Sequence, residues 1–338
     1  MEPDPATIEP FRVAGGVRYE GVLGEGLARP AAMPARLADA LAGAELAMVC
    51  LPSLAHEPIA LALADAGTSC PVLLNPGHAG GALHVAELFR ASGVSLPPLA
   101  ELSTLTYVAR KPAPDAVRVT GVARRVLAAA LPGGEDALTL ACELYPAARP
   151  VRDVLATSLA DVNLVLHPPG AVLAAAWVEA TGGDFRFYVD AMTPGVVRVL
   201  EALDRERLAV AAAYGHELDP LAAEMAAIGT AEAAAAASGD LGSAIAGGEA
   251  NRSIGAPDSL DHRYYAEDFG YGLVPLLALA AAAGVATPLA AALVEVASAL
   301  RGEDLRATGL DAARLGLEDL DRDGILGVVG GEVVQGRA

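Results

Sequence analysis

The chain has 338 residues, a hydrophobic content of 54% and a net charge of −19 at pH 7. This composition excludes a disordered chain and leaves room for two domains with separate cores. The acidic balance, with Lys111 as the single lysine, argues against a nucleic-acid partner and gives no attraction to anionic membranes. An anionic substrate or cofactor would therefore need local arginines to hold it.

Cys50, Cys70 and Cys142 lie far apart in apolar runs, without a CxxC pair or a metal-ligand spacing. This pattern predicts reduced, buried thiols and no metal site. The first residues show neither the basic nor the apolar region of a signal peptide. The apolar stretch 276–300 is interrupted near its middle, so we expect two packed core helices rather than a membrane span. A cytoplasmic protein is predicted.

Strand and helix patterns alternate in the first half of the chain. The apolar run at 46–51 has no polar alternation, which is typical of a strand buried on both faces of a parallel sheet. Alternation of this kind indicates βαβ units and a doubly wound α/β sheet. We expect strands at 17–29 (a short hairpin), 46–51, 71–74 and 102–108, the last paired with 116–121, and helices at 36–46, 56–66 and 83–93.

Two predicted strands end in turn residues, Pro52-Ser53 and Asn75-Pro-Gly77. In doubly wound sheets ligands bind at the carboxyl ends of the strands. Pro52, Ser53, Asn75 and Gly77 are therefore candidates for a ligand site.

The second half reads as almost entirely helical. Strand patterns fade beyond residue 150, which predicts an α/β domain over 1–150 and an all-α domain over 151–338, with a ligand cleft between them. We expect helices at 154–167, 171–181, 194–215, 218–238, 272–283 and 288–300.

The segment 161–170 places Asn163 and His167 four residues apart, on one face of a helix. Pro168 and Pro169 follow at once. Because proline lacks an N–H and disfavours a helical residue before it, we expect the helix to end at His167, where the imidazole could point into a cleft. Taken alone, this segment favours the alternative, which is a buried histidine satisfied by a neighbour.

A second polar cluster occupies 261–268. Arg263 could hold a carboxylate while Asp268 orients an imidazole, or both could simply cap and solvate a helix start. His262 is expected in a solvated loop.

In their order along the chain, these residues resemble the octopine/nopaline (opine) dehydrogenases. The helical half carries the more specific motifs, and the first half fits the family's dinucleotide domain through 51–56, 75–77 and 101–107. The motifs of the helical half are Asn163-x-x-x-His167-Pro, Phe185-Arg-Phe-Tyr188, Thr193-Pro, Arg263-Tyr264-x-x-Glu267-Asp268 and Gly284-Val-x-Thr-Pro288.

The resemblance implies a Rossmann-like dinucleotide-binding domain followed by an all-α domain of the 6-phosphogluconate dehydrogenase C-terminal-like type. It also implies the reductive condensation of an α-keto acid with the amino group of an L-amino acid, with NAD or NADP as cofactor. His167 would be the general acid/base, Asp268 would orient it, and Asn163 and Arg263 would bind substrate. Glu101 would join the strand-end residues in binding the cofactor, and a homodimer is an option.

The sequence departs from the family in one respect. No G-x-G-x-x-G turn opens it, and Met1 aligns just after the family's second strand. We therefore expect a first strand and glycine-rich turn to be missing, NAD(P)H to bind poorly, and the residue that selects NAD over NADP to lie at or before residue 4. A misplaced start is favoured over a real loss.

Two alternatives stay open. One is a cofactor-deficient pseudoenzyme or binding protein of the same fold. The other, ranked lower, is a ketopantoate or glycerol-3-phosphate type reductase. Those enzymes carry a catalytic lysine in the helical domain, whereas Lys111 lies in the first half.

Overall fold

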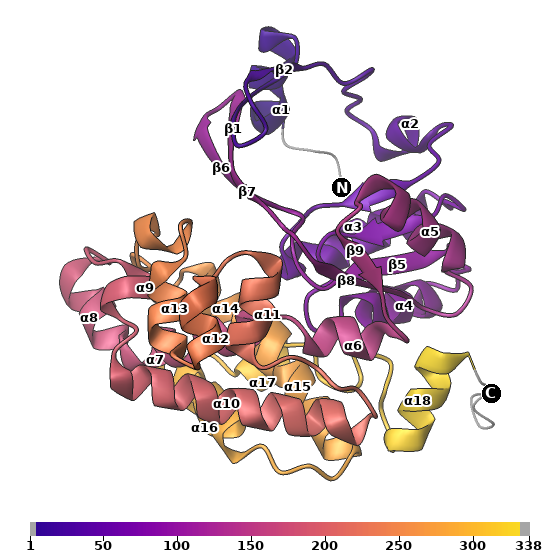
Figure 1. The fold of residues 1–338 in the computed structure, drawn as a ribbon. Helices are drawn as coiled ribbons and strands as arrows, with labels where there is room; N and C mark the ends of the chain where they lie inside the picture. Colours follow the sequence, from indigo (N-terminus) through magenta and orange to yellow (C-terminus); the bar gives the residue numbers. More distant parts are fainter. Residues whose placement is uncertain (1–4, 332–338) are drawn as a thin grey trace.

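The computed structural model describes residues 5–331. Figure 1 shows an α/β lobe, a helical lobe beside it, and an arm of strands that rises above both. The last strand of the α/β lobe, β9 (Ala148–Pro150), lies at the predicted change at residue 150, and α6 (Val154–Leu159) still packs on that lobe before the polypeptide enters the helical lobe. The division into 1–150 and 151–338 stays a prediction.

The α/β lobe contains a five-stranded sheet with the order β3-β4-β5-β8-β9 among the described residues. β3, β4 and β5 run parallel, β8 is antiparallel to β5, and β9 is parallel to β8. The strands are β3 (Ala47–Val49), β4 (Val72–Leu74), β5 (Leu99–Leu102), β8 (Val126–Ala130) and β9.

Helices cover this sheet because the apolar residues of β4 and β5 are buried on both faces. The helices of this lobe are α2 (Leu37–Leu41), a 3₁₀ turn at Ser53–Ala55, α3 (His56–Asp65), α4 (Gly81–Ala91), α5 (Glu135–Leu144) and α6 (Val154–Leu159).

The arm is a separate four-stranded sheet with the order β2-β1-β7-β6 (Figure 1). β1 and β2 form the hairpin expected over 17–29, and β6 pairs with β7. The arm contains α1 (Pro5–Ala14), β1 (Val17–Gly21), β2 (Gly26–Ala28), β6 (Tyr107–Ala113) and β7 (Ala116–Val122).

Three expectations for the first half were wrong in detail. The predicted strand 102–108 is divided, since β5 ends at Leu102 and β6 begins in the other sheet at Tyr107. The chain leaves the sheet for the arm and re-enters it antiparallel, so the sheet is mixed. β3 is an edge strand among the described residues, and its Met48 is 38% exposed rather than buried. The cysteines are free but only partly covered, and Cys50 is exposed.

The helical lobe contains the predicted helices 194–215, 272–283 and 288–300 with shifted ends, whereas the predicted helices 154–167 and 218–238 are each divided in two. Its start signal Thr193-Pro194 behaves as expected, because the Thr193 side chain accepts a hydrogen bond from the Val196 N–H. The main helices are α7 (Asn163–Leu173), α8 (Ala175–Thr181), α9 (Phe187–Asp190), α10 (Pro194–Ala213), α11 (Leu221–Ile228), α12 (Ala233–Ser238), α13 (Leu241–Gly247), α14 (Arg263–Asp268), α15 (Val274–Ala282), α16 (Pro288–Arg301) and α17 (Leu305–Thr308).

Helix α7 does not end at His167 as predicted. It continues through Pro168 and Pro169 to Leu173. Residues 164–171 are all buried, so packing on every side holds the helical path although the prolines provide no N–H to the carbonyls of Leu164 and Val165. Burial overrides the local cost of the prolines here.

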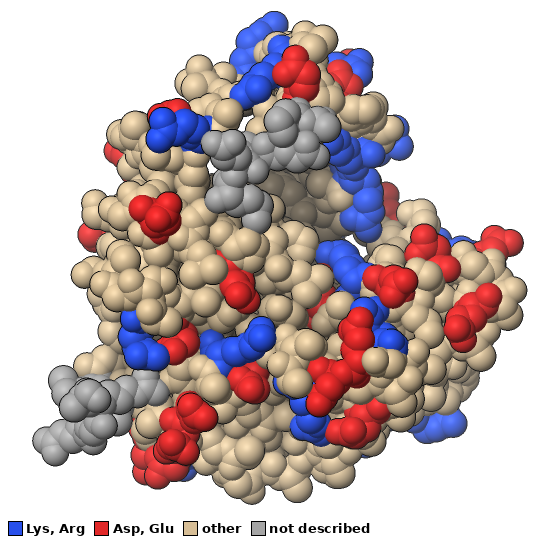
Figure 2. Space-filling view, turned by 180° about the vertical axis from the view of Figure 1, so that it is seen from behind, with Lys and Arg blue, Asp and Glu red and all other residues tan. Residues whose placement is uncertain are grey.

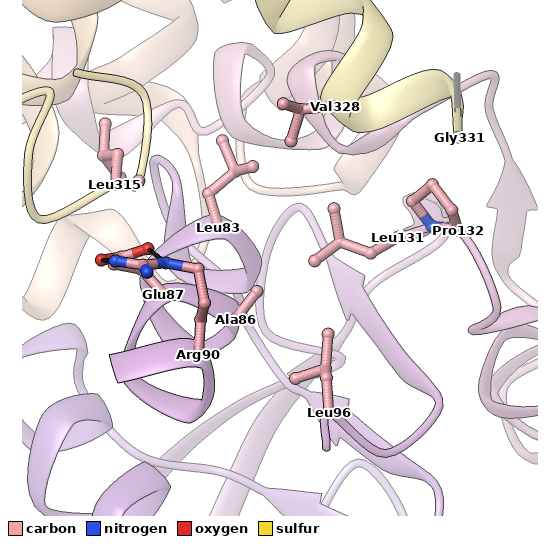
Figure 3. A pocket seen from close by; sticks show the side chains of 11 residues that line it. Leu83, Ala86, Glu87, Arg90, Leu96, Leu131, Pro132, Leu315, Val328 and Gly331 are labelled. Atoms are coloured by element: carbon pink, nitrogen blue, oxygen red, sulfur yellow. Dashed lines mark hydrogen bonds and ion pairs between the residues drawn. The ribbon is translucent and has the colours of Figure 1, made fainter. Parts of the chain in front are cut away.

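The C-terminal helix α18 (Arg322–Gly330) returns to the α/β lobe. A cavity of about 320 Å³ lies between α4, the Leu131-Pro132 turn and the segment after α17 (Figure 3). Its wall is mainly apolar, with Leu83, Leu131 and Val328 facing one another. Helix α18 thus packs against the first lobe.

Among residues 5–331, no individual helix has both the length and the apolar character needed to cross a membrane. One bent pair, 154–173 with 175–181, passes that test on length and composition alone.

Candidate active site

A cavity of about 470 Å³ lies between the base of the β6–β7 arm and the helical lobe. Figure 2, the view from behind, shows a hollow below the arm, with basic side chains along its edge on the side of the helical lobe. The cavity wall includes Asn163 and His167 from α7 and Arg263 from α14. Three of the four residues predicted to act on substrate therefore meet at one cavity.

His167 is held at both ring nitrogens. Its Nδ1 lies 2.9 Å from Asp268 Oδ2, and its Nε2 lies 2.6 Å from the hydroxyl of Tyr188. The predicted partnership of His167 and Asp268 is thus present in the structure. When the pair has given up a proton, the ionised Asp268 accepts the Nδ1–H, and Nε2 then has a lone pair on the side of Tyr188, itself a cavity residue.

Aromatic rings fix the plane of the imidazole. Tyr264 stacks on His167 with ring centroids 3.9 Å apart, and Phe187 meets it edge-on at 6.1 Å. Phe187 approaches α7 closely because Gly170 has no side chain, and a Cβ there would lie 2.8 Å from the Phe187 ring. The Tyr188 and Tyr264 hydroxyls are 3.1 Å apart, so the rings also form a hydrogen-bonded chain.

Helical spacing explains how α14 serves the site. Tyr264 and Asp268 are four residues apart, so they share one face and both reach His167. A π-helical turn, Phe269–Leu273, follows directly and leads into α15, and such turns often occur at functional sites. His262 was wrongly expected in a solvated loop. Its side chain caps α14 by accepting from the Tyr264 N–H, and its ring packs edge-on against Tyr264.

Arginines give the cavity its charge. The side chain of Arg263 is 54% exposed and lies 3.4 Å from Glu267. Arg110, in β6, and Arg124, just after β7, also line the cavity, as does Glu249. In a protein of net charge −19, this is a local surplus of positive charge suited to carboxylates.

Burial dominates the protonation of the central pair. Burial, together with the charge of Arg263, lowers the pKa of His167 to about 3. Burial also raises the pKa of Asp268 well above its usual range, with help from the charges of Glu267 and Asp161. Both shifts disfavour charge, so the pair is neutral as a whole, with one proton shared along its hydrogen bond.

A second set of ionisable groups lies behind this pair and was not predicted from the sequence. His78 Nδ1 is 3.5 Å from Asp161 Oδ2, and its Nε2 is 3.6 Å from Glu267 Oε1. The Ser53 N–H and hydroxyl also donate to Glu267, at 2.8 and 2.9 Å. The available signals were their positions at quoted motifs, since His78 directly follows Asn75-Pro-Gly77 and Glu267 stands inside Arg263-Tyr264-x-x-Glu267-Asp268.

The residues predicted to bind cofactor do not line the cavity around His167. Their polar side chains form hydrogen bonds with other groups of the protein. Asn75 donates to Thr106 at 3.0 Å. Glu101 is fully buried and accepts from the Ala82 N–H at 2.9 Å and from Thr157. Gly77 packs on Glu101, where an added Cβ would lie 2.1 Å from Oε2. Pro52 begins the 3₁₀ turn that buries Ser53. Their role in cofactor binding stays a prediction.

Comparison with known proteins places this geometry in a family. Residues 150–301 match the family described as NAD/NADP octopine/nopaline dehydrogenase, alpha-helical domain. An opine dehydrogenase of Arthrobacter sp. (strain 1C) is 31% identical over 329 residues, which cover 96% of this chain and 90% of the relative. The chain belongs to the opine dehydrogenase family. Its predicted family and its predicted class, an oxidoreductase that depends on a nicotinamide dinucleotide, are confirmed.

Solved structures confirm the predicted fold class. Octopine dehydrogenase in complex with NADH and agmatine superposes with a TM-score of 0.75 at 21% identity, over 98% of this chain and 91% of that one. A ketopantoate reductase from Ralstonia eutropha JMP134 reaches 0.56 at 18% identity, over 90% and 89%. The fold is thus shared with both enzyme classes, and the family match lies with the opine dehydrogenases.

Proposed function

We propose that this protein condenses an α-keto acid with the amino group of an L-amino acid and that the resulting imine is reduced at the expense of NAD(P)H. The observation that supports this most is the His167 imidazole, fixed between Asp268 and Tyr188 at the wall of a cavity that carries three arginines. The reaction needs one proton donor and acceptor beside a site for two carboxylates, and the cavity offers both.

His167 would act as the general acid/base. Addition of the amine to the keto carbon gives a carbinolamine, which loses its hydroxyl as water when His167 donates a proton to it. Loss of this water leaves the protonated imine, which accepts a hydride at carbon and so becomes the secondary amine. Asp268 would stabilise the imidazole in the tautomer whose Nε2 exchanges the proton.

Arg263 would bind a substrate carboxylate, with Asn163 beside it on α7. The exposed part of the Arg263 side chain leaves donors free for a ligand while one nitrogen contacts Glu267. Arg110 and Arg124 have no acidic partner among residues 5–331, so they are suited to a second carboxylate. Both substrates and the product carry such groups.

The dinucleotide, when bound, supplies the hydride. Its predicted place is at the carboxyl ends of β3, β4 and β5, where Pro52, Ser53, Asn75, Gly77 and Glu101 lie. The apolar side chains of Met48, Leu51 and Leu54 are 38–42% exposed there, and such a surface fits a ligand that covers it. Ser53 and Asn75 would then position backbone rather than contact the ligand through their bonded side chains.

The residue that selects NAD over NADP is expected at or before residue 4, and residues 1–4 lie outside the described residues. The division into domains 1–150 and 151–338, a homodimer and a cytoplasmic location are likewise parts of the proposal. Free thiols at Cys50, Cys70 and Cys142 suit a reducing compartment.

A substrate panel tests the reaction. The purified chain is given NADH or NADPH, pyruvate and one L-amino acid at a time, and loss of the reduced nicotinamide absorbance is recorded with product analysis by mass spectrometry. We expect a secondary amine dicarboxylate, and a loss of at least ~10²-fold in kcat/KM for His167→Asn. Full activity of that variant would exclude the role given to His167.

Cofactor binding is measured separately by nicotinamide fluorescence. The missing G-x-G-x-x-G turn predicts weak binding, and micromolar affinity would contradict this prediction. Absence of any condensation product at saturating cofactor would instead favour the alternative of a binding protein with the same fold.

A further inference from the structure

The seam between the two lobes contains a histidine that the proposed chemistry does not use. His78 comes from the segment between β4 and α4, whereas both of its carboxylate partners come from the helical lobe. Its side chain is only 11% exposed, and its backbone has a φ of +57°, a conformation that is uncommon outside glycine. The surrounding structure therefore holds this ring in one place.

The carboxylates beside His78 need a positive partner. Asp161 and Glu267 are both buried, with side-chain exposures of 4% and 5%. Asp161 also accepts from the Asn163 N–H at the start of α7, and Glu267 is adjacent in sequence to Asp268. Arg263 contacts Glu267 alone, through a half-exposed side chain. His78 is within 3.6 Å of both carboxylates.

The charged groups around His78 indicate its protonation state. Beside the His167–Asp268 pair lie two buried carboxyl side chains, Asp161 and Glu267, and one arginine, Arg263. A neutral His78 would leave one uncompensated buried negative charge next to the pair, which is unfavourable in a poorly solvated site. A protonated His78 closes the balance.

We propose that a protonated His78 joins the two lobes by bridging Asp161 and Glu267 and, as a positioning residue, sets the charge that His167 experiences. Burial opposes the charged form of His78, but the hydrogen bond and charge of Asp161 and the charges of Glu267 and Asp268 outweigh it and raise its pKa above the ordinary value. The titratable or charged groups that face His78 are His56 on α3, Glu101 on β5, Asp161 before α7, His167 on α7, and Glu267 and Asp268 on α14.

Only the predicted effect of His78 on the rate of condensation rests on the proposed function. Removing the positive charge should raise the pKa of the His167–Asp268 pair, because a negative field favours the protonated form. The limb of the pH profile that reports this pair should therefore move to higher pH.

The direct test needs no activity. In wild-type protein with ¹⁵N-labelled histidine, the His78 signal is assigned by its disappearance in His78→Gln. At pH 6.5, both ring nitrogens of His78 should show the shifts of N–H groups for more than half of the molecules. A predominantly neutral ring at pH 6.5 would overturn the proposal, whether or not the protein condenses amino acids.

The kinetic test uses the condensation assay. For His78→Gln, the pH profile of kcat/KM should shift upward by about one unit, while His84→Gln should leave it in place. His84 is a matched control because it is also buried, on α4, but makes no ion pair among the described residues. An activity loss in His78→Gln without a shift of the profile would reduce His78 to a packing role and overturn the proposal.

Discussion

Two groups of polar residues at the lobe interface behave differently. Around His167, the side chains bind one another but leave one face open to the cavity, so a substrate can compete for Nε2 and for Arg263. At the strand ends, Asn75 and Glu101 are bonded entirely to protein atoms. A polar residue after a strand can thus either contact a ligand directly or hold the backbone in position. Its hydrogen-bond partners in the folded protein distinguish these two roles.

Asp268→Asn would sharpen this comparison most. An asparagine can donate its amide N–H to Nδ1 and so place the proton on Nε2, the wrong tautomer for accepting one. We expect kcat to fall by about 10²-fold with the fold retained. Steady-state kinetics over a range of pH values, with circular dichroism for the fold, would measure this.

The matched control is Asp204→Asn. Asp204 is also a buried aspartate, paired with Arg207 and bonded to the Leu221 N–H, but it lies away from the cavity. Its loss should lower stability and leave kcat per folded molecule unchanged. Equal losses of kcat in both variants would mean that Asp268 contributes packing rather than orientation.

Arg263→Ala should affect KM rather than kcat, and by less than Asp268→Asn affects kcat. Loss of a charged hydrogen bond to a carboxylate should raise KM for one substrate by about 10- to 100-fold. Because the Arg263 charge lowers the pKa of His167, the pH profile should also move upward. Arg198→Ala on α10, a residue outside the cavity wall, serves as the control. A change confined to kcat would argue against a carboxylate contact.

Sequence patterns predicted local structure better than contacts between lobes. The strands at 46–51 and 71–74 and the helix starting at Pro194 follow from apolar runs and a capping residue, and the structure contains them. The prediction that α7 ends at His167 failed because complete burial outweighs the proline effect. A local sequence pattern cannot show how completely a helix will be buried by the rest of the chain.

The candidate site shows the same limit. The spacing of Asn163 and His167 was readable, and the family resemblance added Asp268, which does contact His167. His78 escaped notice because its partners, Asp161 and Glu267, lie in the other half of the chain. Tyr188 and Tyr264 stood inside quoted motifs, but only the folded chain brings their rings to the imidazole.

The strand-end group makes a prediction about stability rather than rate. Burial raises the pKa of Glu101 to about 7 from 4.5, although hydrogen bonds from Thr157, Ala82 and Ser158 oppose the rise. Because the folded-state value is the higher one, the stability that protonated Glu101 contributes is complete below pH 4.5 and is lost as the pH rises through 7. The difference amounts to about 3 kcal/mol of unfolding free energy.

Glu101→Gln should remove this dependence. The amide keeps the shape and can still accept from the Ala82 N–H, but it carries no charge to desolvate. Urea unfolding at pH 5 and pH 8.5 should show that the free energy of unfolding of the variant, relative to that of the wild type, is larger at the higher pH. Glu143→Gln, at an exposed position of α5, should follow the wild type at both. If the stability of Glu101→Gln falls with pH as that of the wild type does, Glu101 is already ionised in the folded protein. A contact between its side chain and the cofactor would then be the better explanation for its place at the end of β5.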